Sequence, residues 1–201
     1  MKPLGPIPAG FDVIDGELAI GGRKASELVA AAGSTPAFIY SSDFLRRRAG
    51  ELRAAMPSRL DLHFAVKANP FLPLLKVMSE LVDGFDIASG GELAIVQAAG
   101  INPLLISFAG PGKRTEELEA AIRAGATINL ESEGEAERAL AAAERLGITP
   151  RLAIRVNPDF DLKGSGMKMG GGPSSSALMP SACRRWSDAW LMPGPSGAAF
   201  I

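Results

Sequence analysis

The chain contains almost no cysteine and has no strong excess of either charge. Cys183 is the single cysteine among 201 residues, so an internal disulfide is excluded. Acidic residues outnumber basic ones by 22 to 21, and a balance so close to neutral gives no sign of nucleic acid or an anionic membrane surface as a partner. We therefore expect the substrate to be a small molecule.

Long apolar runs are also absent. No stretch approaches the roughly 18 continuous apolar residues that a membrane-spanning helix needs. Residues 1–10 contain a lysine but lack the apolar core of a secretory signal peptide. Together with the single cysteine, these features predict a cytoplasmic protein without a membrane partner. Apolar residues nevertheless make up 47% of the chain, which is enough for one large core.

Short apolar runs alternate with amphipathic stretches from residue 63 onward. The runs begin at positions 63, 85, 104, 127 and 151, and they read HFAVKA, FDIAS, LLISFAG, TINLES and RLAIRVNP. Successive starts are separated by 22, 19, 23 and 24 residues, which is the length of one strand followed by one helix. The pattern predicts an α/β fold with a parallel sheet.

The stretches between the runs carry helix start and stop signals. Ser89 and Ser132 are each followed three residues later by a glutamate, as in a capping box. Glycines stand where left-handed caps end helices, at Gly100, Gly125 and Gly147. These local signals agree with the strand-helix pattern, which supports the assignment.

A β-hairpin is predicted ahead of these repeats. Residues 11–20 read as two short strands joined by an Asp15-Gly16 turn. The elements expected next are a helix, a strand and a basic amphipathic helix, over residues 25–33, 37–40 and 43–56.

Lys67 is the residue at which the sequence most clearly indicates chemistry. It follows the apolar residues 64–66, where an ammonium group would lose hydration. Loss of hydration favours the neutral amine, which is a nucleophile and can form a Schiff base with an aldehyde cofactor. Asn69-Pro70 ends the strand, so Lys67 is expected near its carboxyl end, where catalytic groups of parallel α/β folds collect. The alternative is a strand-end lysine whose amine reaches water.

Three further charged residues stand at strand ends in the same register, namely Asp86, Glu92 and Arg155. In a parallel barrel these positions meet at one mouth, so an amine, two carboxylates and a guanidinium could face a common ligand. Each residue also has a structural alternative. Glu92 could serve only as the capping partner of Ser89. Asp86 could bind a backbone amide, and Arg155 could pair with a neighbouring carboxylate.

Five segments, taken in order, resemble one known family. They read AVKANP, DGFDIASGGEL, SFAGPGK, INLES and RVNP. This set is similar to the pyridoxal-phosphate-dependent decarboxylases of the ornithine, diaminopimelate and arginine type (fold type III), over residues 1–173. The closest likeness is to the branch described as exosortase-system-associated, whose members carry a run like Lys163 to Pro173 in this chain.

The resemblance implies a partial TIM-type (β/α) barrel of the alanine racemase-like decarboxylase type, with about five of the eight βα units. It implies that Lys67 forms a Schiff base with pyridoxal 5'-phosphate and that Asp86, Glu92 and Arg155 lie around this cofactor, without a metal. The implied reaction is decarboxylation of a basic or diamino acid. Full-length members of the family are expected to be homodimers.

Two other functions stay open on the same residues. An alanine racemase-like isomerase shares the early lysine, and a non-catalytic pyridoxal-phosphate-binding protein would use the barrel alone. The DIASGGE and GSGMKM segments favour the decarboxylase. The run Gly164 to Gly172 is interpreted as a substrate-side loop rather than as a phosphate cradle.

The sequence predicts three parts. Residues 1–35 form the hairpin and helix that would join an absent β-domain, and residues 36–173 form the amino-terminal part of the barrel. Residues 174–201 show neither helical nor strand periodicity and depart from the family, so we interpret them as a disordered or out-of-frame tail. Because five strands do not close an eight-stranded barrel, we expect this chain to be a fragment that is inactive alone.

Overall fold

The computed structural model describes residues 10–156 of the chain. By compactness the chain forms two units, one of Met1–Leu62 with Glu80–Val82 and one of His63–Ser79 with Asp83–Ile201. The division after Leu62 lies beyond the boundary at residue 35 that the sequence predicts. The Lys163–Pro173 run and the tail with Cys183 lie outside the described residues. Among the described helices, none combines the length and the apolar character needed to cross a bilayer.

The first unit contains a three-stranded antiparallel sheet, whose strands in order are β1 (Asp12–Ile14), β2 (Glu17–Ile20) and β3 (Arg23–Lys24). Asp15 and Gly16 join β1 to β2 with φ values of 51° and 77°, as a two-residue hairpin turn with positive φ requires. The predicted hairpin is therefore confirmed. The short strand β3 was not predicted.

Two helices follow in this unit, α1 (Ala25–Ala32) and α2 (Ser42–Ala55), close to the predicted positions. The strand predicted over residues 37–40 is wrong, because this segment forms no ladder with any described strand and Phe38 is 87% exposed. A strand needs a neighbour that takes its backbone N–H and C=O groups. An apolar run in the sequence does not show whether that neighbour exists.

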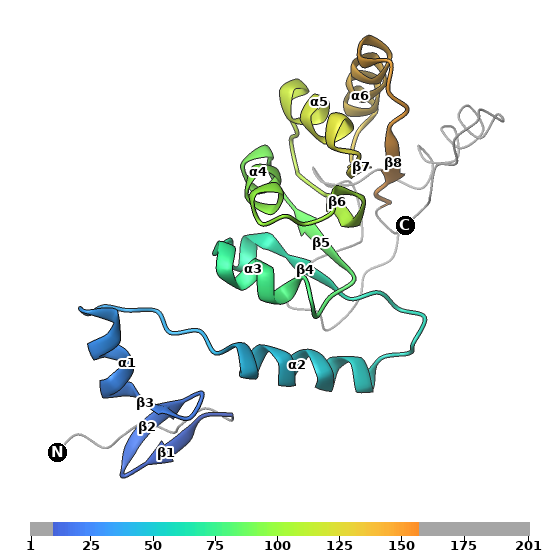
Figure 1. The fold of residues 1–201 in the computed structure, drawn as a ribbon. Coiled ribbons are helices and arrows are strands. Elements are labelled where there is room, and N and C mark those ends of the chain that lie inside the picture. The colour runs from blue at the N-terminus through green and yellow to red at the C-terminus, as the bar shows by residue number, and fades with distance from the viewer. Residues whose placement is uncertain (1–9, 157–201) are drawn as a thin grey trace. The chain divides into compact units, whose positions relative to one another are not determined.

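The second unit contains a parallel sheet of five strands (Figure 1). Spatial order follows chain order through β4 (His63–Ala65), β5 (Gly84–Ile87), β6 (Ile106–Phe108), β7 (Thr127–Leu130) and β8 (Arg151–Ile154). Every neighbouring pair is parallel. The α/β class and the five strands expected from the spacing are therefore confirmed.

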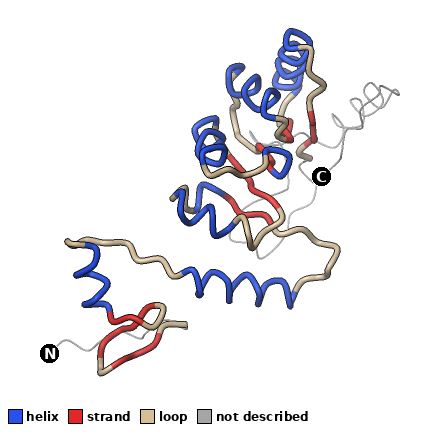
Figure 2. The backbone as a smooth tube through the Cα atoms, viewed as in Figure 1, coloured by secondary structure: helices blue, strands red, loops and turns tan. Residues whose placement is uncertain are grey.

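Helices alternate with these strands along the chain (Figure 2), as α3 (Leu72–Met78), α4 (Gly90–Ala98), α5 (Thr115–Ala124) and α6 (Glu133–Leu146). Two 3-10 turns, η1 (Val66–Ala68) and η2 (Pro103–Leu105), complete the unit. Alternate residues of the central strands are apolar and buried: Phe85, Ile87, Ile106, Phe108, Ile128 and Leu130. The residues between them, Asp86, Ser107 and Asn129, are polar and part-exposed. The strand period of two therefore separates the core from a polar face of the sheet.

The two predicted capping serines begin α4 and α6. Ser89 Oγ accepts the N–H of Glu92 at 3.2 Å, while Glu92 Oε2 accepts the N–H of Ala88 at 2.8 Å. At α6 the two equivalent bonds measure 3.3 and 2.9 Å and involve Glu131, Ser132 and Glu135. Each glutamate thus bonds to the residue before the serine, and it ties the end of a strand to the start of the next helix.

Gly84 in β5 has no room for a side chain, whereas Gly50 in α2 does. A Cβ on Gly84 would lie 2.5 Å from His63 Cε1 and 2.8 Å from the backbone oxygen of Leu105. We expect Gly84→Ala to lower the free energy of unfolding by about 1–3 kcal/mol, because a backbone oxygen does not rotate away. Gly50→Ala meets nothing within 4 Å and should raise it by about 0.5–1 kcal/mol. Urea denaturation measures both, and changes of the same sign would contradict the steric explanation.

Candidate functional site

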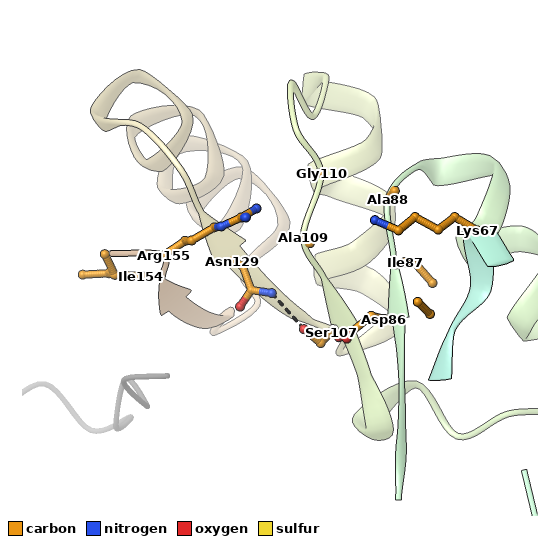
Figure 3. A pocket seen from close by; sticks show the side chains of 11 residues that line it. Lys67, Asp86, Ile87, Ala88, Ser107, Ala109, Gly110, Asn129, Ile154 and Arg155 are labelled. Carbon is orange, nitrogen blue, oxygen red and sulfur yellow. Dashed lines mark hydrogen bonds between the residues drawn. The ribbon is translucent and has the colours of Figure 1, made fainter. Parts of the chain in front are cut away.

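A pocket of about 360 Å³ lies at the carboxyl ends of the parallel strands (Figure 3). All five strands, or the residues that directly follow them, contribute to its lining: Ala65, Lys67, Asp86, Ile87, Ala88, Ser107, Ala109, Gly110, Asn129, Ile154 and Arg155. Catalytic groups of parallel α/β folds collect at this end of the strands.

Lys67 lies in η1, directly after β4, and its side chain extends over the strand ends (Figure 3). It does lie at the carboxyl end of a strand. The expectation that its amine is enclosed in an apolar strand is wrong, because the strand ends at Ala65 and Lys67 is exposed. Val66 takes the buried position instead. The 3-10 turn therefore leaves Lys67 exposed at the pocket and accessible to a ligand.

Asp86 lies on β5 between its register partners Ala65 and Ser107. Its Oδ1 is 3.6 Å from Nδ1 of His63 on the neighbouring strand, and both side chains are part-exposed. The carboxylate lines the pocket on the polar face of the sheet. The sequence did not indicate this histidine neighbour, because adjacency between strands depends on their register.

Arg155 follows β8 and lies at the other end of the sheet from Lys67. Its Nη1 donates to Oε1 of Glu131 at 2.8 Å, so the carboxylate pair considered as its structural alternative is present. The guanidinium nevertheless lines the pocket. Figure 3 shows Lys67 and Arg155 pointing toward one another over the strand ends.

Glu92 is not among the residues that line the pocket. It lies in the first turn of α4, where its carboxylate accepts the backbone N–H of Ala88. The alternative role of Glu92, as the capping partner of Ser89, is therefore observed. Its carboxylate reaches the pocket wall only through the bond to Ala88. The structure brings Lys67, Asp86 and Arg155 together and leaves Glu92 behind that wall.

Ser107 and Asn129 also line the pocket, although the sequence analysis did not select them. The amide nitrogen of Asn129 donates to Ser107 Oγ at 2.8 Å across two neighbouring strands. Each is a polar residue between two buried apolar residues of its strand. The alternation along the strand could have identified both.

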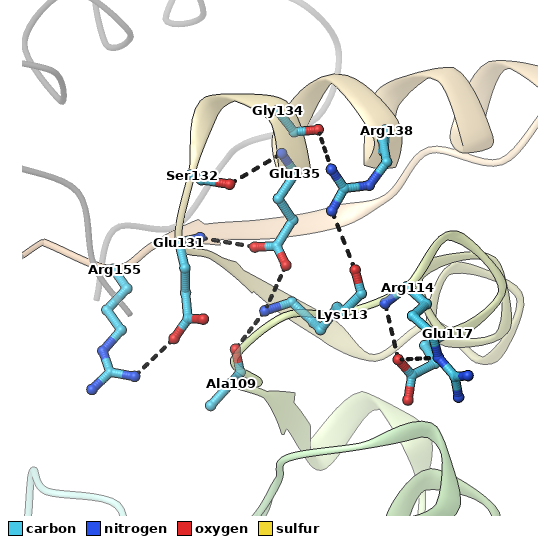
Figure 4. A network of polar contacts seen from close by, with 10 residues as sticks. All are labelled: Ala109, Lys113, Arg114, Glu117, Glu131, Ser132, Gly134, Glu135, Arg138 and Arg155. Carbon is cyan, nitrogen blue, oxygen red and sulfur yellow. Dashed lines mark hydrogen bonds and ion pairs between the residues drawn. The ribbon is translucent and has the colours of Figure 1, made fainter. Parts of the chain in front are cut away.

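A buried polar network lies beside Arg155 (Figure 4). The side chain of Lys113 is 0% exposed, and its amine lies 3.1 Å from Oε1 of Glu135 and also donates to the carbonyl oxygen of Ala109. Glu135 in turn accepts the N–H of Glu131. Lys113 and Glu131 were missed, although each stands just beyond an apolar run, which is the signal that selected Lys67.

The carboxylate of Glu131 is the least satisfied group in this network. Its side chain is 4% exposed, and its Oε2 has no hydrogen-bond partner among the described residues. Burial raises the pKa of Glu131, and nearby Glu135 adds to this effect, while Lys113 and Arg155 oppose it. A buried carboxylate of this kind keeps its charge only as long as both cations stay close.

The pocket residues fit an aldehyde cofactor that carries charged groups. Among the described residues of the lining, Lys67 is the one that carries a primary amine, and a primary amine is what binds an aldehyde covalently. Arg155 offers donors to an anion, and Asp86 offers an acceptor to a cation. In the part of the chain that the structure covers, no group of three or more His, Cys, Asp or Glu side chains is placed to hold a metal ion.

The chain is similar to known proteins in both sequence and structure. Residues 42–175 match the family described as "Pyridoxal-dependent decarboxylase, pyridoxal binding domain". The chain is 44% identical over 150 residues to the diaminopimelate decarboxylase of Aquifex aeolicus. The aligned residues make up 74% of this chain and 35% of that protein. It is 36% identical over 140 residues to the L-glutamyl-(BtrI acyl-carrier protein) decarboxylase of Niallia circulans. Here the aligned residues make up 69% of this chain and 33% of that protein.

The fold was also found among solved structures. The crystal structure of the Helicobacter pylori diaminopimelate decarboxylase, complexed with L-lysine, matches with a TM-score of 0.73 and 28% identity. The match covers 87% of this chain and 46% of that chain. This confirms the decarboxylase-type α/β fold. The chain spans about a third of the length of the two curated relatives.

Two glutamates of this unit should affect stability with opposite dependence on pH. Hydrogen bonds from the backbone N–H groups of Arg114 and Gly90 lower the pKa of Glu117, whereas burial raises that of Glu131. The contribution of Glu117 to folding is therefore lost as pH falls, and that of Glu131 is lost as pH rises. We compare the free energy of unfolding of each variant with that of wild type at the same pH. As pH rises from acid to neutral, this difference should increase for Glu131→Gln and decrease for Glu117→Gln.

The measurement is urea denaturation of the wild-type chain and both variants over that pH range. Each variant is the matched control for the other, because both replace a glutamate of the second unit by its neutral isostere. Parallel pH profiles for the two variants would contradict the assignment.

Proposed function

The chain belongs to the family of pyridoxal-dependent decarboxylases, and on this premise we propose that the whole protein decarboxylates a diamino acid with pyridoxal phosphate held at Lys67. The observation that carries the proposal is a primary amine at the carboxyl end of a parallel strand, in a pocket that also contains a carboxylate and a guanidinium. The cofactor predicted from the sequence is confirmed by the pyridoxal-binding domain that residues 42–175 match.

The named relatives support the reaction class and the substrate class. Both curated relatives are decarboxylases, which favours decarboxylation over the racemase-like isomerase and over the non-catalytic carrier. The higher identity, 44%, is to a diaminopimelate decarboxylase. The solved decarboxylase with a similar fold is complexed with L-lysine, which is itself a diamino acid. We therefore propose diaminopimelate or a similar diamino acid as the substrate.

Each residue of the pocket has a role in this proposal. Pyridoxal phosphate, when bound, draws electrons from the bond that is broken at the α-carbon of an amino acid. Lys67 holds the aldehyde covalently, and Arg155 and Asp86 bind groups of opposite charge on the cofactor or the substrate. Ser107 and Asn129, joined by their hydrogen bond, offer a fixed polar surface. For Glu92 we propose an indirect role, in which it holds Ala88 and so shapes the pocket wall.

The remaining proposals concern the whole protein and rest on the family resemblance. Residues 1–35 would belong to a second, β-rich domain and residues 36–173 to the barrel, while residues 174–201 would belong to neither. The whole protein would act as a homodimer in the cytoplasm on a small amino acid. The likeness to the exosortase-associated branch stays a prediction, because the Lys163–Pro173 run lies outside the described residues.

Lys67→Ala tests the proposed attachment point. The chain is incubated with pyridoxal phosphate, reduced with borohydride, digested and analysed by peptide mass spectrometry. We expect the reduced cofactor on Lys67 in wild type and its loss from this position in Lys67→Ala, together with loss of the visible absorbance of the mixture. Lys76→Ala is the matched control, because Lys76 is an exposed lysine of α3 that does not line the pocket. Labelling of Lys76 instead of Lys67 would refute the proposal.

The substrate proposal is tested by release of carbon dioxide. Diaminopimelate, ornithine and arginine are supplied in turn to the whole protein loaded with pyridoxal phosphate. We expect release from diaminopimelate to exceed release from the other two by about tenfold or more, because a missing charged group leaves its partner in the site unpaired.

Because β4 and β8 are both edge strands among the described residues, the 201-residue chain alone should release little. If arginine releases more carbon dioxide than diaminopimelate, the proposed substrate is wrong and arginine takes its place.

A further inference from the structure

The direction in which the Arg155 side chain points is set by one carboxylate. Its side chain is 34% exposed, and long cationic side chains of this kind have many accessible rotamers. The side-chain hydrogen bond described for Arg155 is the one from Nη1 to Glu131 Oε1, at 2.8 Å. A charge-assisted bond to a nearly buried carboxylate selects one direction for the guanidinium, which Figure 3 shows pointing into the pocket.

Glu131 is itself held in place by the surrounding network (Figure 4). Its backbone N–H donates to Glu135 at 2.9 Å, and Glu135 forms the ion pair with fully buried Lys113. The carbonyl oxygen of Lys113 accepts from Arg138 at 3.2 Å, and the amine lies 5.6 Å from the centre of the Phe108 ring. These contacts fix the backbone of Glu131, and its side chain is only 4% exposed, so close packing limits where the carboxylate that supports Arg155 can lie.

The same network reaches the pocket at a second place. Lys113 donates to the carbonyl oxygen of Ala109, and both Ala109 and Gly110 line the pocket. A Cβ on Gly110 would lie 2.8 Å from Lys113 Nζ and 3.3 Å from Glu131 Oε2. Gly110 therefore allows the buried charges to lie directly against the pocket wall.

We infer that Glu131 is a positioning residue of this pocket, which acts by holding the Arg155 guanidinium in the direction needed to bind an anionic group of the cofactor or substrate. The inference rests on the proposed function, because pyridoxal phosphate is the ligand through which it is tested. Glu131 lines no part of the pocket and is not proposed to touch the ligand. Its effect on binding should therefore depend entirely on Arg155.

A double-mutant cycle measures that dependence. The affinity of the 201-residue chain for pyridoxal phosphate is determined from visible absorbance for wild type, Glu131→Gln, Arg155→Met and the double variant. We expect each single substitution to weaken binding by about tenfold, and the double variant to bind no more weakly than Arg155→Met. If Glu131→Gln weakens binding equally in the Arg155→Met background, its role is general to the fold and the inference is wrong. Unchanged affinity in Glu131→Gln would overturn it as well.

Two further variants separate positioning from folding. Glu131→Asp keeps the charge and should retain more affinity than Glu131→Gln. Glu119→Gln is the matched control, because it removes a carboxylate that pairs with Arg145 at 2.6 Å, with both side chains part-exposed. Its affinity should equal that of wild type. A loss in Glu119→Gln as large as in Glu131→Gln would show that any missing ion pair has this effect, and the inference would fail.

A second measurement needs no cofactor. Phenylglyoxal modifies accessible arginines, and the rate at Arg155 is followed by peptide mass spectrometry. We expect this rate to rise several-fold in Glu131→Gln and to stay at the wild-type level in Glu119→Gln, since only the first variant frees the guanidinium. An unchanged rate overturns the inference. If wild type binds no pyridoxal phosphate but the rate rises in Glu131→Gln, the proposed function fails and the positioning of Arg155 by Glu131 stands.

Discussion

The backbone ladder that joins β4 to β8 in chain order is the constraint on which the rest of the second unit depends. Because every pair is parallel, all five strands end on the same edge of the sheet. Residues separated by almost 90 positions, such as Lys67 and Arg155, thereby line one pocket. The register also decides which residues face it, since a shift by one position would exchange Asp86 for a buried neighbour.

Charged side chains have two roles at the carboxyl ends of these strands. Glu92 and Glu135 accept backbone N–H groups at the starts of helices and so fix the loops that follow the strands. Glu131, Lys113 and Arg155 form, with Glu135, a set of two carboxylates and two cations in or beside the core. A buried charge without a partner is costly, so such a set is stable only with all its members in place. The set therefore ties the wall behind Arg155 to the core through ion pairs.

Two of the relatives share sequence with this chain but differ in the substrate that their names give. Two decarboxylases whose names give different substrates are 44% and 36% identical to this chain, over 150 and 140 residues. Residues 42–175 match the family described as the pyridoxal binding domain. The match over residues 42–175 therefore bears on the cofactor and not on the choice of substrate.

Most of the secondary structure and part of the site could be predicted from local patterns. The spacing of apolar runs determined the five strands, Asp15-Gly16 determined the hairpin turn, and Ser89 and Ser132 determined two helix starts, because each feature depends on residues close together in the chain. Lys67 and Asp86 could be placed near strand ends for the same reason. The exposed position of Lys67, the absence of a strand over residues 37–40 and the side-chain partner of Arg155 could not, because they depend on contacts between distant segments.

By itself, then, the sequence determined the order and type of most of the elements and the resemblance that names the cofactor. Only the tertiary structure decided that Glu131 holds Arg155, that Lys113 is buried against Glu135, and that Glu92 serves a helix start behind the pocket wall. The physical reason is that burial and ion pairing arise when strands and helices far apart in the sequence pack together, whereas turns, caps and periodicity arise within a few residues.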